Sequence, residues 1–331
     1  MDVKEMYPLS EQAVACRLHQ LERMKQILDG RSSQLLVLVG PCSADSEVAV
    51  LSYMEKLRKL ADEVKDKLLI VPRVYTNKPR TTGDGYKGML HQPDPLSPPD
   101  ILQGLYAIRR LHMRCLEEYG FAPADEMLYP EDHRYLSDVL SYVAVGARSV
   151  ENQQHRLVAS GLDIPVGMKN PTSGNLHTML HSITAAQHSH RFLYRGWEVE
   201  SHGNPYAHGI LRGGMNTEGV RHPNYDTDSL LSAHALYAQT DACHPALLID
   251  TNHYNSGKNF ALQGDIVLSV MKSRAQYADI RGLVKGFMIE SYLYDGACSA
   301  EAGHPLGTSI TDPCLGWEKT RELLLKLADN G

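Results

Sequence analysis

Residues 35–42 read Leu-Leu-Val-Leu-Val-Gly-Pro-Cys, and this stretch sets a pattern that the rest of the chain repeats. A short, continuous apolar run is typical of a strand that is buried on both faces of a parallel sheet. Cys42 follows directly after the run, where the strand is expected to end. The same arrangement, an apolar run followed by a polar or reactive side chain, recurs along the sequence.

Eight further runs of apolar and β-branched residues follow the first one. They are Leu68–Tyr75, Ala122–Leu128, Val143–Ala147, Ile164–Met168, Arg191–Tyr194, Gly209–Leu211, Ala246–Ile249 and Leu283–Ile289. Helical patterns such as Ser46–Val64 and Pro99–Tyr119 lie between most of them. Strands that alternate with helices are typical of parallel strands joined by crossover helices. The sequence therefore predicts an α/β fold, a (β/α)8 TIM barrel, with eight of the nine runs as its strands.

The remaining run is expected to belong to a hairpin insertion, around either Arg191 or Gly209. Gly203-Asn204-Pro205 lies between these two runs and has the composition of a turn. A doubly wound open sheet is the alternative fold. No G-x-G-x-x-G motif follows a predicted strand, which disfavours a dinucleotide-binding form of that sheet.

The chain is expected to divide into two parts. Residues 10–30 have the pattern of an amphipathic helix, with Ser10 as its N-cap and Gly30 as its C-cap. We therefore predict an N-terminal helical extension over residues 1–33 and a barrel catalytic domain over residues 34–331.

Composition and charge argue against several classes of protein. No apolar run approaches the ~20 residues of a membrane span, and the charged N-terminus does not resemble a signal peptide. The six cysteines are scattered without a C-x-x-C pair, so neither a disulfide framework nor a zinc knuckle is expected. The formal net charge of −6 argues against nucleic acid as a partner. We expect a cytoplasmic protein that binds neither nucleic acid nor membranes.

Charged side chains follow nearly every predicted strand, at the rim where barrel enzymes carry their catalytic residues. One group of them is cationic: Arg73, Lys78, Arg80, Arg148, Lys169 and Arg212. Cations gathered at one barrel mouth repel one another unless anions compensate them, and arginine suits phosphate and carboxylate groups. The group therefore predicts substrates with several negative charges. The alternative is that each cation pairs with a carboxylate of the barrel.

A second group at the same rim combines sulfur, nitrogen and oxygen donors: Cys42, His253, Glu290 and Asp312. Such a mixed set predicts a site for a divalent metal ion. A Cys-His-Asp nucleophilic triad is the alternative, but nothing else in the sequence resembles a hydrolase elbow or an oxyanion loop. With the cations, and without a nucleotide motif, this set indicates aldol-like or phosphoryl-leaving chemistry on small anionic substrates.

Read as whole strings, these motifs resemble the class I, microbial 3-deoxy-D-arabino-heptulosonate 7-phosphate (DAHP) synthases. The resemblance runs from about Leu35 to about Ala328. Its main strings are Gly40-Pro41-Cys42-Ser43, Lys78-Pro79-Arg80-Thr81-Thr82, Gly146-Ala147-Arg148, Lys169-Asn170, Ile210-Leu211-Arg212-Gly213-Gly214, Glu290-Ser291 and Ser309-Ile310-Thr311-Asp312.

The resemblance implies roles for these residues. Cys42, His253, Glu290 and Asp312 would hold a divalent metal ion such as Mn²⁺, Co²⁺ or Fe²⁺. Phosphoenolpyruvate would be bound by Arg73, Lys78, Glu126, Ala147, Arg148, Lys169 and Arg212. The aldose phosphate would be bound by Lys78, Pro79, Arg80 and Thr81. The catalytic residues would be Lys78, Lys169 and His253, with Lys169 or a metal-held water transferring a proton.

The reaction implied by the resemblance condenses phosphoenolpyruvate with erythrose 4-phosphate and water, and it yields DAHP and phosphate. This is the first step of the shikimate pathway of aromatic amino acid biosynthesis. The resemblance also implies a homodimer or a homotetramer.

Three strings depart from the family pattern. They are Ala44-Asp45-Ser46 in place of Ile-His-Asp, Asp125–Tyr129 in place of Gly-Glu-Phe-Leu-Asp, and Pro171-Thr172-Ser173 in place of Gly-Thr-Asp. These changes suit a paralogue that uses a different aldose in a specialised pathway, or an ordinary DAHP synthase of a distant lineage. We favour the ordinary enzyme. A catalytically inactive regulatory barrel is a third interpretation, disfavoured because no ligand residue is lost.

The region of the family's usual effector pocket also departs from its pattern. Many members are inhibited by an aromatic amino acid that binds outside the barrel mouth. Here His133-Arg134 align with a common Pro-Gln pair of that pocket, and Asp163 aligns with a serine. Only 41 residues precede Cys42, so part of the extension that closes the pocket is expected to be missing. We expect no strong inhibition by phenylalanine or tyrosine.

Overall fold

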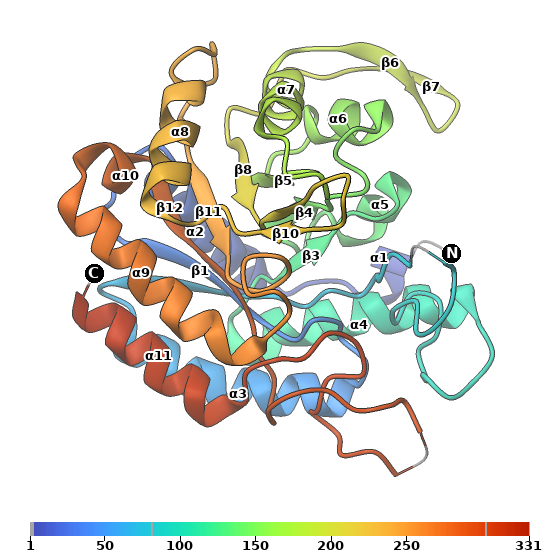
Figure 1. Ribbon diagram of the computed structural model, residues 1–331. Helices are drawn as coiled ribbons and strands as arrows, with labels where there is room; N and C mark the ends of the chain where they lie inside the picture. The colour runs from blue at the N-terminus through green and yellow to red at the C-terminus, as the bar shows by residue number, and fades with distance from the viewer. Residues whose placement is uncertain (1–2, 81, 302, 331) are drawn as a thin grey trace.

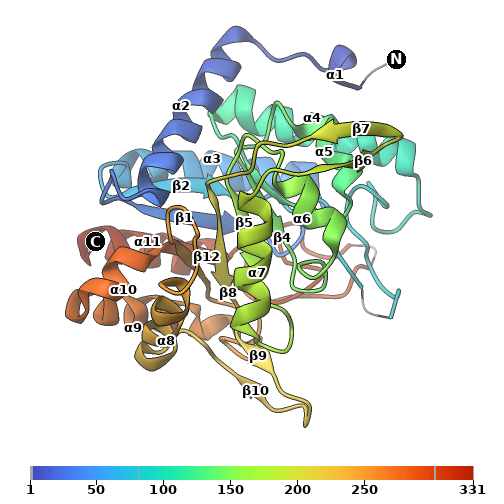
Figure 2. The ribbon, with the colours of Figure 1, turned by 90° about the horizontal axis from the view of Figure 1, so that it is seen from above.

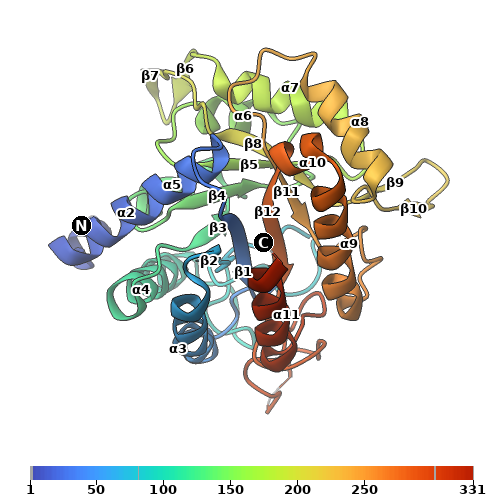
Figure 3. The same ribbon diagram turned by 90° about the vertical axis from the view of Figure 1, so that its left-hand side faces the viewer.

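Eight parallel strands form a ring at the centre of the molecule (Figures 1 and 3). The computed structural model describes residues 3–80, 82–301 and 303–330. The strands are β1 (Leu35–Gly40), β2 (Leu68–Pro72), β3 (Ala124–Glu126), β4 (Tyr142–Val145), β5 (Val166–Lys169), β8 (Ala207–Leu211), β11 (Leu247–Asp250) and β12 (Val284–Glu290). They pair in the order β2-β1-β12-β11-β8-β5-β4-β3, and a parallel bridge between Arg73 and Ala124 joins the two ends. The predicted TIM barrel is confirmed.

Helices surround the ring on its outer side (Figure 3). The longer ones are α3 (Glu47–Val64), α4 (Ile101–Tyr119), α6 (Gln153–Ala159), α7 (Leu176–Gln187), α8 (Thr227–Tyr237), α9 (Gln263–Gln276) and α11 (Trp317–Asn330). Short helical turns are α1 (Val3–Met6), η1 (Pro130–Asp132), α5 (His133–Leu136), η2 (Phe260–Leu262) and α10 (Ala278–Leu283). Polar caps begin several of the longer helices, as Ser46 does for α3 and Asp100 for α4. No helix within the described residues is long and apolar enough to cross a membrane.

Two layers of apolar side chains hold the barrel together, one inside the ring and one between the ring and the helices. Successive residues of a strand face opposite sides. Leu36 and Leu38 of β1 therefore belong to the inner cluster, while Val37 and Val39 belong to the outer one. Because both faces are buried, the strands read as continuous apolar runs. Space inside is limited, since a Cβ at Gly167 would collide with the hydroxyl of Tyr142.

Helix α2 (Glu11–Leu28) closes the ring at the N-terminal ends of the strands (Figure 3). Its side chains Met24, Ile27 and Leu28 are at most 1% exposed and belong to the same cluster as the inward-facing residues of the strands. Ser10 is the N-cap as predicted, because its side chain accepts a hydrogen bond from the backbone N–H of Ala13. The predicted C-cap is wrong by one residue: Asp29 is the cap, and Gly30 follows it with a φ of 82°.

The predicted hairpin insertion consists of β6 (Arg191–Tyr194) and β7 (Trp197–Glu200), which lie outside the ring (Figure 2). Its turn is Arg195-Gly196, where both residues have positive φ. The expected turn at Gly203-Asn204-Pro205 is present, since the backbone N–H of Ala207 donates to the carbonyl of Asn204, but it joins the hairpin to the barrel strand β8. A second small ribbon, β9 (Gly214–Met215) with β10 (Arg221–His222), follows β8 and was not predicted.

The closure of the barrel by α2 can be tested by truncating one of its buried side chains. We expect Ile27→Ala to lower the free energy of unfolding by about 2–5 kcal/mol, because it leaves a cavity in a packed core. Leu18→Ala on the same helix is the matched control, since Leu18 is 55% exposed. Its effect should stay within about 0.5 kcal/mol. Urea unfolding followed by circular dichroism measures both, and equal effects of the two substitutions would contradict this role of α2.

Candidate active site

A cavity of about 290 Å³ opens at the C-terminal ends of the barrel strands. Nearly all the predicted substrate-binding residues line it: Arg73, Lys78, Pro79, Arg80, Glu126, Ala147, Arg148, Lys169 and Arg212. His253 and Asp312 also line the cavity, whereas Cys42 and Glu290 are fully buried. Thr81 lies outside the described residues. Residues that are far apart in the sequence thus meet at one rim, because they lie at or after the C-terminal ends of several different strands.

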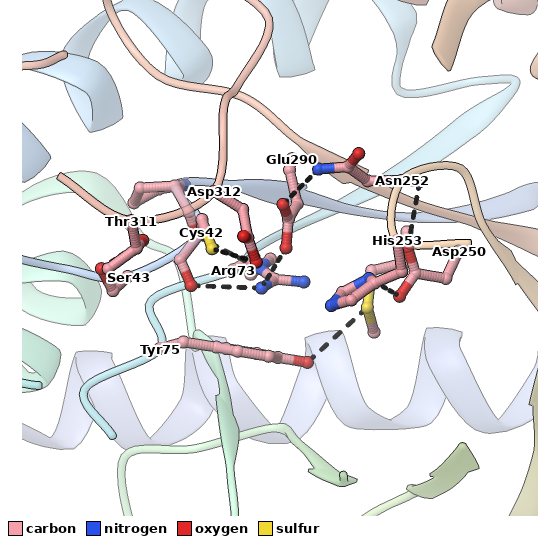
Figure 4. A network of polar contacts seen from close by, with 12 residues as sticks. Cys42, Ser43, Arg73, Tyr75, Asp250, Asn252, His253, Glu290, Thr311 and Asp312 are labelled. Atoms are coloured by element: carbon pink, nitrogen blue, oxygen red, sulfur yellow. Dashed lines mark hydrogen bonds and ion pairs between the residues drawn. The ribbon is translucent and has the colours of Figure 1, made fainter. Parts of the chain in front are cut away.

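Three of the four predicted metal ligands lie together (Figure 4). One atom each of Cys42, Glu290 and Asp312 lies within 4.8 Å of the other two. Cys42 follows β1, Glu290 ends β12, and Asp312 lies in the loop before α11. The close approach of β1 and β2 depends on Gly40, since a Cβ there would collide with the backbone carbonyl of Arg73.

His253 is not part of this close group, and its place as the fourth ligand stays a prediction. Its Nδ1 lies 2.9 Å from Oδ2 of Asp250, the last residue of β11. Its φ is 51°, a left-handed conformation that is uncommon for residues other than glycine. A carboxylate beside one ring nitrogen fixes the ring and leaves the other nitrogen available as a ligand.

Arg73 is buried against the carboxylate of Glu290. Its guanidinium donates to the carbonyls of Pro41 and Cys42, lies 2.8 Å from Glu290 Oε1, and is 3.9 Å from the ring centroid of Tyr75. Burial opposes the charge of this side chain, but Glu290 raises the pKa of Arg73 above its ordinary value. Arg73 Nη1 is buried without a hydrogen-bond partner, so the guanidinium can still bind an anion.

Two lysines compensate the charge of Asp312. Lys78 Nζ lies 3.3 Å from Asp312 Oδ2 and 2.7 Å from the sulfur of Cys42, and Lys258 Nζ lies 2.8 Å from Asp312 Oδ1. Burial alone would raise the pKa of Asp312, but Lys78 and Lys258 hold it well below its usual range. The carboxylate is therefore charged at neutral pH. Burial raises the pKa of the Cys42 thiol, and Glu290 adds to this effect.

The donor set of Cys42, Glu290 and Asp312 fits a divalent metal ion. A thiol sulfur and two carboxylates offer soft and hard ligand atoms that several first-row metals accept. Glu290 Oε1 is buried and has no hydrogen bond of good geometry, although Arg73 Nη2 lies 2.8 Å away. A buried carboxylate oxygen without a hydrogen bond is what a metal ligand offers before the ion binds.

Arg148 and Arg212 differ from Arg73, Lys78 and Lys169, because neither has a carboxylate within ion-pair distance among the described residues. Arg212 lies over the ring of Tyr254, 4.5 Å from its centroid, and its Nη1 is buried without a hydrogen-bond partner. Burial lowers the pKa of Arg212 and the charge of Arg148 lowers it further, while Asp250 opposes both. An anion between the two guanidinium groups would supply the missing partner.

Lys169 ends β5 and pairs with a buried carboxylate. Its Nζ donates to Asp250 Oδ2 at 3.0 Å, the same oxygen that faces His253. Burial would raise the pKa of Asp250, but His253 and Lys169 hold it well below its usual range. The alternative in which each cation pairs with a barrel carboxylate is thus correct for Arg73, Lys78 and Lys169. It is not correct for Arg80, Arg148 and Arg212, as far as the chain is described.

The remaining predicted residues are placed by neighbouring glycines and backbone groups. Glu126 ends β3, and a Cβ at Gly146 would lie 2.5 Å from its Oε1, so glycine there leaves room for the carboxylate. Arg80 Nε donates to the carbonyl of Tyr86 at 2.8 Å, which holds the loop that follows Lys78.

Four residues of the site were missed from the sequence. Asp250 holds Lys169 and His253, Asn252 donates to Glu290, Tyr254 lies beneath Arg212, and Lys258 pairs with Asp312. Asp250 could have been found, since it is a charged residue at the end of an otherwise apolar strand, as Glu290 is. The other three lie after strand β11, where nothing in their spacing marks them.

The chain matches the model of a known family along most of its length. This model is described as "DAHP synthetase I family" and matches residues 7–325. Among curated proteins, the chain is 39% identical to "Phospho-2-dehydro-3-deoxyheptonate aldolase, Phe-sensitive" of Escherichia coli (strain K12), over 98% of this chain and 91% of that protein. It is 37% identical to the "tyrosine-inhibited" aldolase of the same name from Candida albicans, over 92% of this chain and 82% of that protein.

A solved structure agrees with this match. The chain superposes with a TM-score of 0.92 on "Structure of Phospho-2-dehydro-3-deoxyheptonate aldolase from Francisella tularensis SCHU S4". The two sequences are 29% identical, and the superposition covers 99% of this chain and 94% of the other. The similarity therefore extends over the barrel and its N-terminal helices together.

Loss of one donor should weaken metal binding without unfolding the protein. We expect Cys42→Ala to reduce Mn²⁺ affinity by about tenfold or more, since even partners that only orient a ligand are worth that much. Cys243→Ala is the control, because Cys243 is exposed and distant from the group. Equilibrium dialysis followed by metal analysis measures the affinity, and the melting temperature checks the fold. Unchanged Mn²⁺ binding by Cys42→Ala would rule out this donor set.

Proposed function

The chain belongs to the DAHP synthetase I family, and we propose that it condenses phosphoenolpyruvate with erythrose 4-phosphate and water to give DAHP and phosphate. One observation carries the proposal. The cavity that contains the unpaired cations Arg148 and Arg212 also contains Asp312 of the metal-binding group. A phosphate site and a site for a Lewis acid therefore share one barrel mouth, as a condensation of two phosphorylated substrates requires.

We propose that Cys42, His253, Glu290 and Asp312 hold a divalent metal ion, with Mn²⁺, Co²⁺ or Fe²⁺ as candidates. When bound, such an ion supplies Lewis-acid polarisation of the aldehyde oxygen of the acceptor. The ion would draw Glu290 and Asp312 away from the cations that now compensate them. Arg73 and Lys78 would then be free for the carboxylate of phosphoenolpyruvate.

The remaining chemistry belongs to the side chains of the chain itself. Arg148 and Arg212 bind the phosphate of phosphoenolpyruvate, with Glu126 and Ala147 beside them. The Lys78-Pro79-Arg80-Thr81 segment binds the phosphate of the aldose. These cations hold two mutually repelling anions close enough for C3 of phosphoenolpyruvate to attack the aldehyde carbon. They also stabilise the charge that moves as water adds at C2 and phosphate leaves by C–O cleavage.

We propose Lys169 as the residue that transfers a proton during these steps. Its side chain is 3% exposed, and its ammonium group donates to Asp250 Oδ2 at 3.0 Å, which holds the group in place at the cavity. Asp250 also holds the His253 ring, so one carboxylate positions a proton carrier and a metal ligand.

The acceptor is best tested by assaying a panel of aldoses for phosphoenolpyruvate consumption and phosphate release. We expect erythrose 4-phosphate to give the highest kcat/KM in the presence of Mn²⁺. Preference for another aldose would favour a paralogue in a specialised pathway. No turnover with any aldose would favour an inactive regulatory barrel.

We further propose that residues 1–33 act as an extension of the barrel domain 34–331, and that the protein forms homodimers or homotetramers.

The two phosphate sites should respond separately to substitution. We expect Arg212→Ala to lower kcat/KM for phosphoenolpyruvate. The corresponding loss of transition-state stabilisation should be about 2–5 kcal/mol, the scale for losing a buried charged partner. Arg80→Ala should instead impair use of the aldose phosphate. Steady-state kinetics with each substrate varied in turn distinguish the two. An Arg80→Ala enzyme with unchanged KM and kcat for the aldose would place the acceptor elsewhere.

Insensitivity to phenylalanine and tyrosine stays a prediction. A cavity of about 310 Å³ lies between α5, α6 and the β6–β7 hairpin, and His133 and Arg134 line it. Burial lowers the pKa of His133 to about 4, so this ring is neutral at physiological pH, and its Nδ1 is buried without a partner. We expect no inhibition by submillimolar phenylalanine or tyrosine in steady-state assays. Submillimolar inhibition would show that His133, Arg134 and Asp163 do not block an effector.

A further inference from the structure

A second polar cavity lies at the opposite end of the barrel from the site described above. Its volume is about 440 Å³, and it lies where the N-terminal ends of β1 and β12 meet α10. Figure 3 looks at this end of the ring and shows α10 beside β12. Catalysis at the other end of the barrel does not account for this cavity. The residues at the N-terminal end of a barrel contribute to its stability rather than to its catalysis.

Four cations line this cavity: Lys67, Arg274, Arg281 and Lys285. The last three have no carboxylate within ion-pair distance in the described part of the chain. Arg274, at the end of α9, donates to the carbonyls of Val284 and Arg281. Its Nε is buried without a hydrogen-bond partner. The guanidinium is thus fixed in place with one donor unused.

The three cations also act unfavourably on one another. Burial and, to a smaller extent, the charge of Arg281 together lower the pKa of Arg274 to about 10. Burial and Arg274 together lower the pKa of Lys285, against the opposing effect of Asp29. A cluster of like charges at a partly buried position costs stability unless an anion compensates it.

The carboxylates nearby are turned to other partners. Asp29 accepts hydrogen bonds from the backbone N–H and the side chain of Arg31. Asp66, which also lines the cavity, interacts electrostatically with Arg23. Neither carboxylate contacts Arg274, Arg281 or Lys285 within ion-pair distance, as far as the chain is described. Asp29 and Asp66 therefore compensate the positive charge of the cavity only in part.

We propose that this cavity binds a small phosphate-bearing molecule, held by Arg274, Arg281 and Lys285. Guanidinium groups match the oxygens of a phosphate, and several cations suit its double negative charge better than that of a single carboxylate. The volume of the cavity falls within the roughly 300–1,000 Å³ of small-molecule sites, so a phosphomonoester fits as well as inorganic phosphate. The proposal does not depend on the activity proposed above.

Calorimetric titration of the metal-free, full-length protein with inorganic phosphate tests this site. We expect phosphate to bind at both ends of the barrel: first in the active-site cavity, and second, as a separate site, in the cavity of Arg274, Arg281 and Lys285. Arg281→Gln should weaken the second site by about tenfold or more, because a charge-assisted contact is lost, and Lys285→Gln should do the same. Arg148→Ala/Arg212→Ala should remove only the first site. A titration with glycerol 3-phosphate shows whether the second site binds a phosphomonoester or only the free phosphate ion. A titration with acetate shows whether the site binds a carboxylate as tightly as phosphate.

Lys272→Gln is the matched control, since Lys272 is an exposed cation of α9 outside the cavity lining. It should bind phosphate as the unchanged protein does, and all variants should keep its melting temperature. Arg281 is exposed, so its substitution leaves the fold intact. The proposal is overturned if a second phosphate site is absent in the millimolar range, if Arg281→Gln and Lys285→Gln leave that site unchanged, or if acetate binds there as tightly as phosphate.

Discussion

The structure depends on the compensation of charge at the C-terminal ends of the barrel strands. A buried thiol and two carboxylates, Cys42, Glu290 and Asp312, lie within 4.8 Å of one another. Isolated charges cost much free energy when they are removed from water. Arg73 and Lys78 offset that cost here, and Lys258 adds a third positive charge. Arg73 and Lys78 stabilise this group in the absence of ligands. A carboxylate substrate would need these two cations as well.

This compensation of charge is incomplete. The buried polar atoms that lack a partner are where we propose that ligands bind. Arg73 Nη1, Arg212 Nη1 and Glu290 Oε1 are buried without hydrogen-bond partners. Native proteins leave few such atoms, so each one calls for an explanation. Two of them are donors that suit anions, and the third is an acceptor that suits a metal ion. One set of substrates and one metal ion would give all three atoms a partner. The unpaired atoms of the rim are therefore explained by the chemistry that we propose for it.

Much of the barrel could be predicted from the sequence, because each strand is buried on both faces and reads as an apolar run. All nine predicted runs are strands, and the hairpin insertion falls at Arg191–Tyr194 as one of two expected positions. The turn inside the hairpin was not predicted, because Arg195-Gly196 is a weaker turn signal than Gly203-Asn204-Pro205, which joins the hairpin to β8. Residues that line the cavity, such as Arg148, Lys169 and Arg212, were predicted from their places after the strands. Asn252, Tyr254 and Lys258 were missed, since a loop can bring any polar residue to the rim and spacing does not reveal which.

The two ends of the barrel thus have different physical characters. Met24, Ile27 and Leu28 close the inside of the ring at its N-terminal end with apolar packing, and the cavity of Arg274, Arg281 and Lys285 lies at the edge of that end. The C-terminal end opens directly into a charged, underpaired cavity. The central claim is that this underpaired end is completed by a metal ion and phosphoenolpyruvate. A crystal structure with Mn²⁺ and phosphoenolpyruvate tests it most directly. We predict an anomalous peak for Mn²⁺ among Cys42, His253, Glu290 and Asp312, with the phosphate between Arg148 and Arg212. Mn²⁺ bound elsewhere, or a phosphate that contacts neither arginine, would contradict the account.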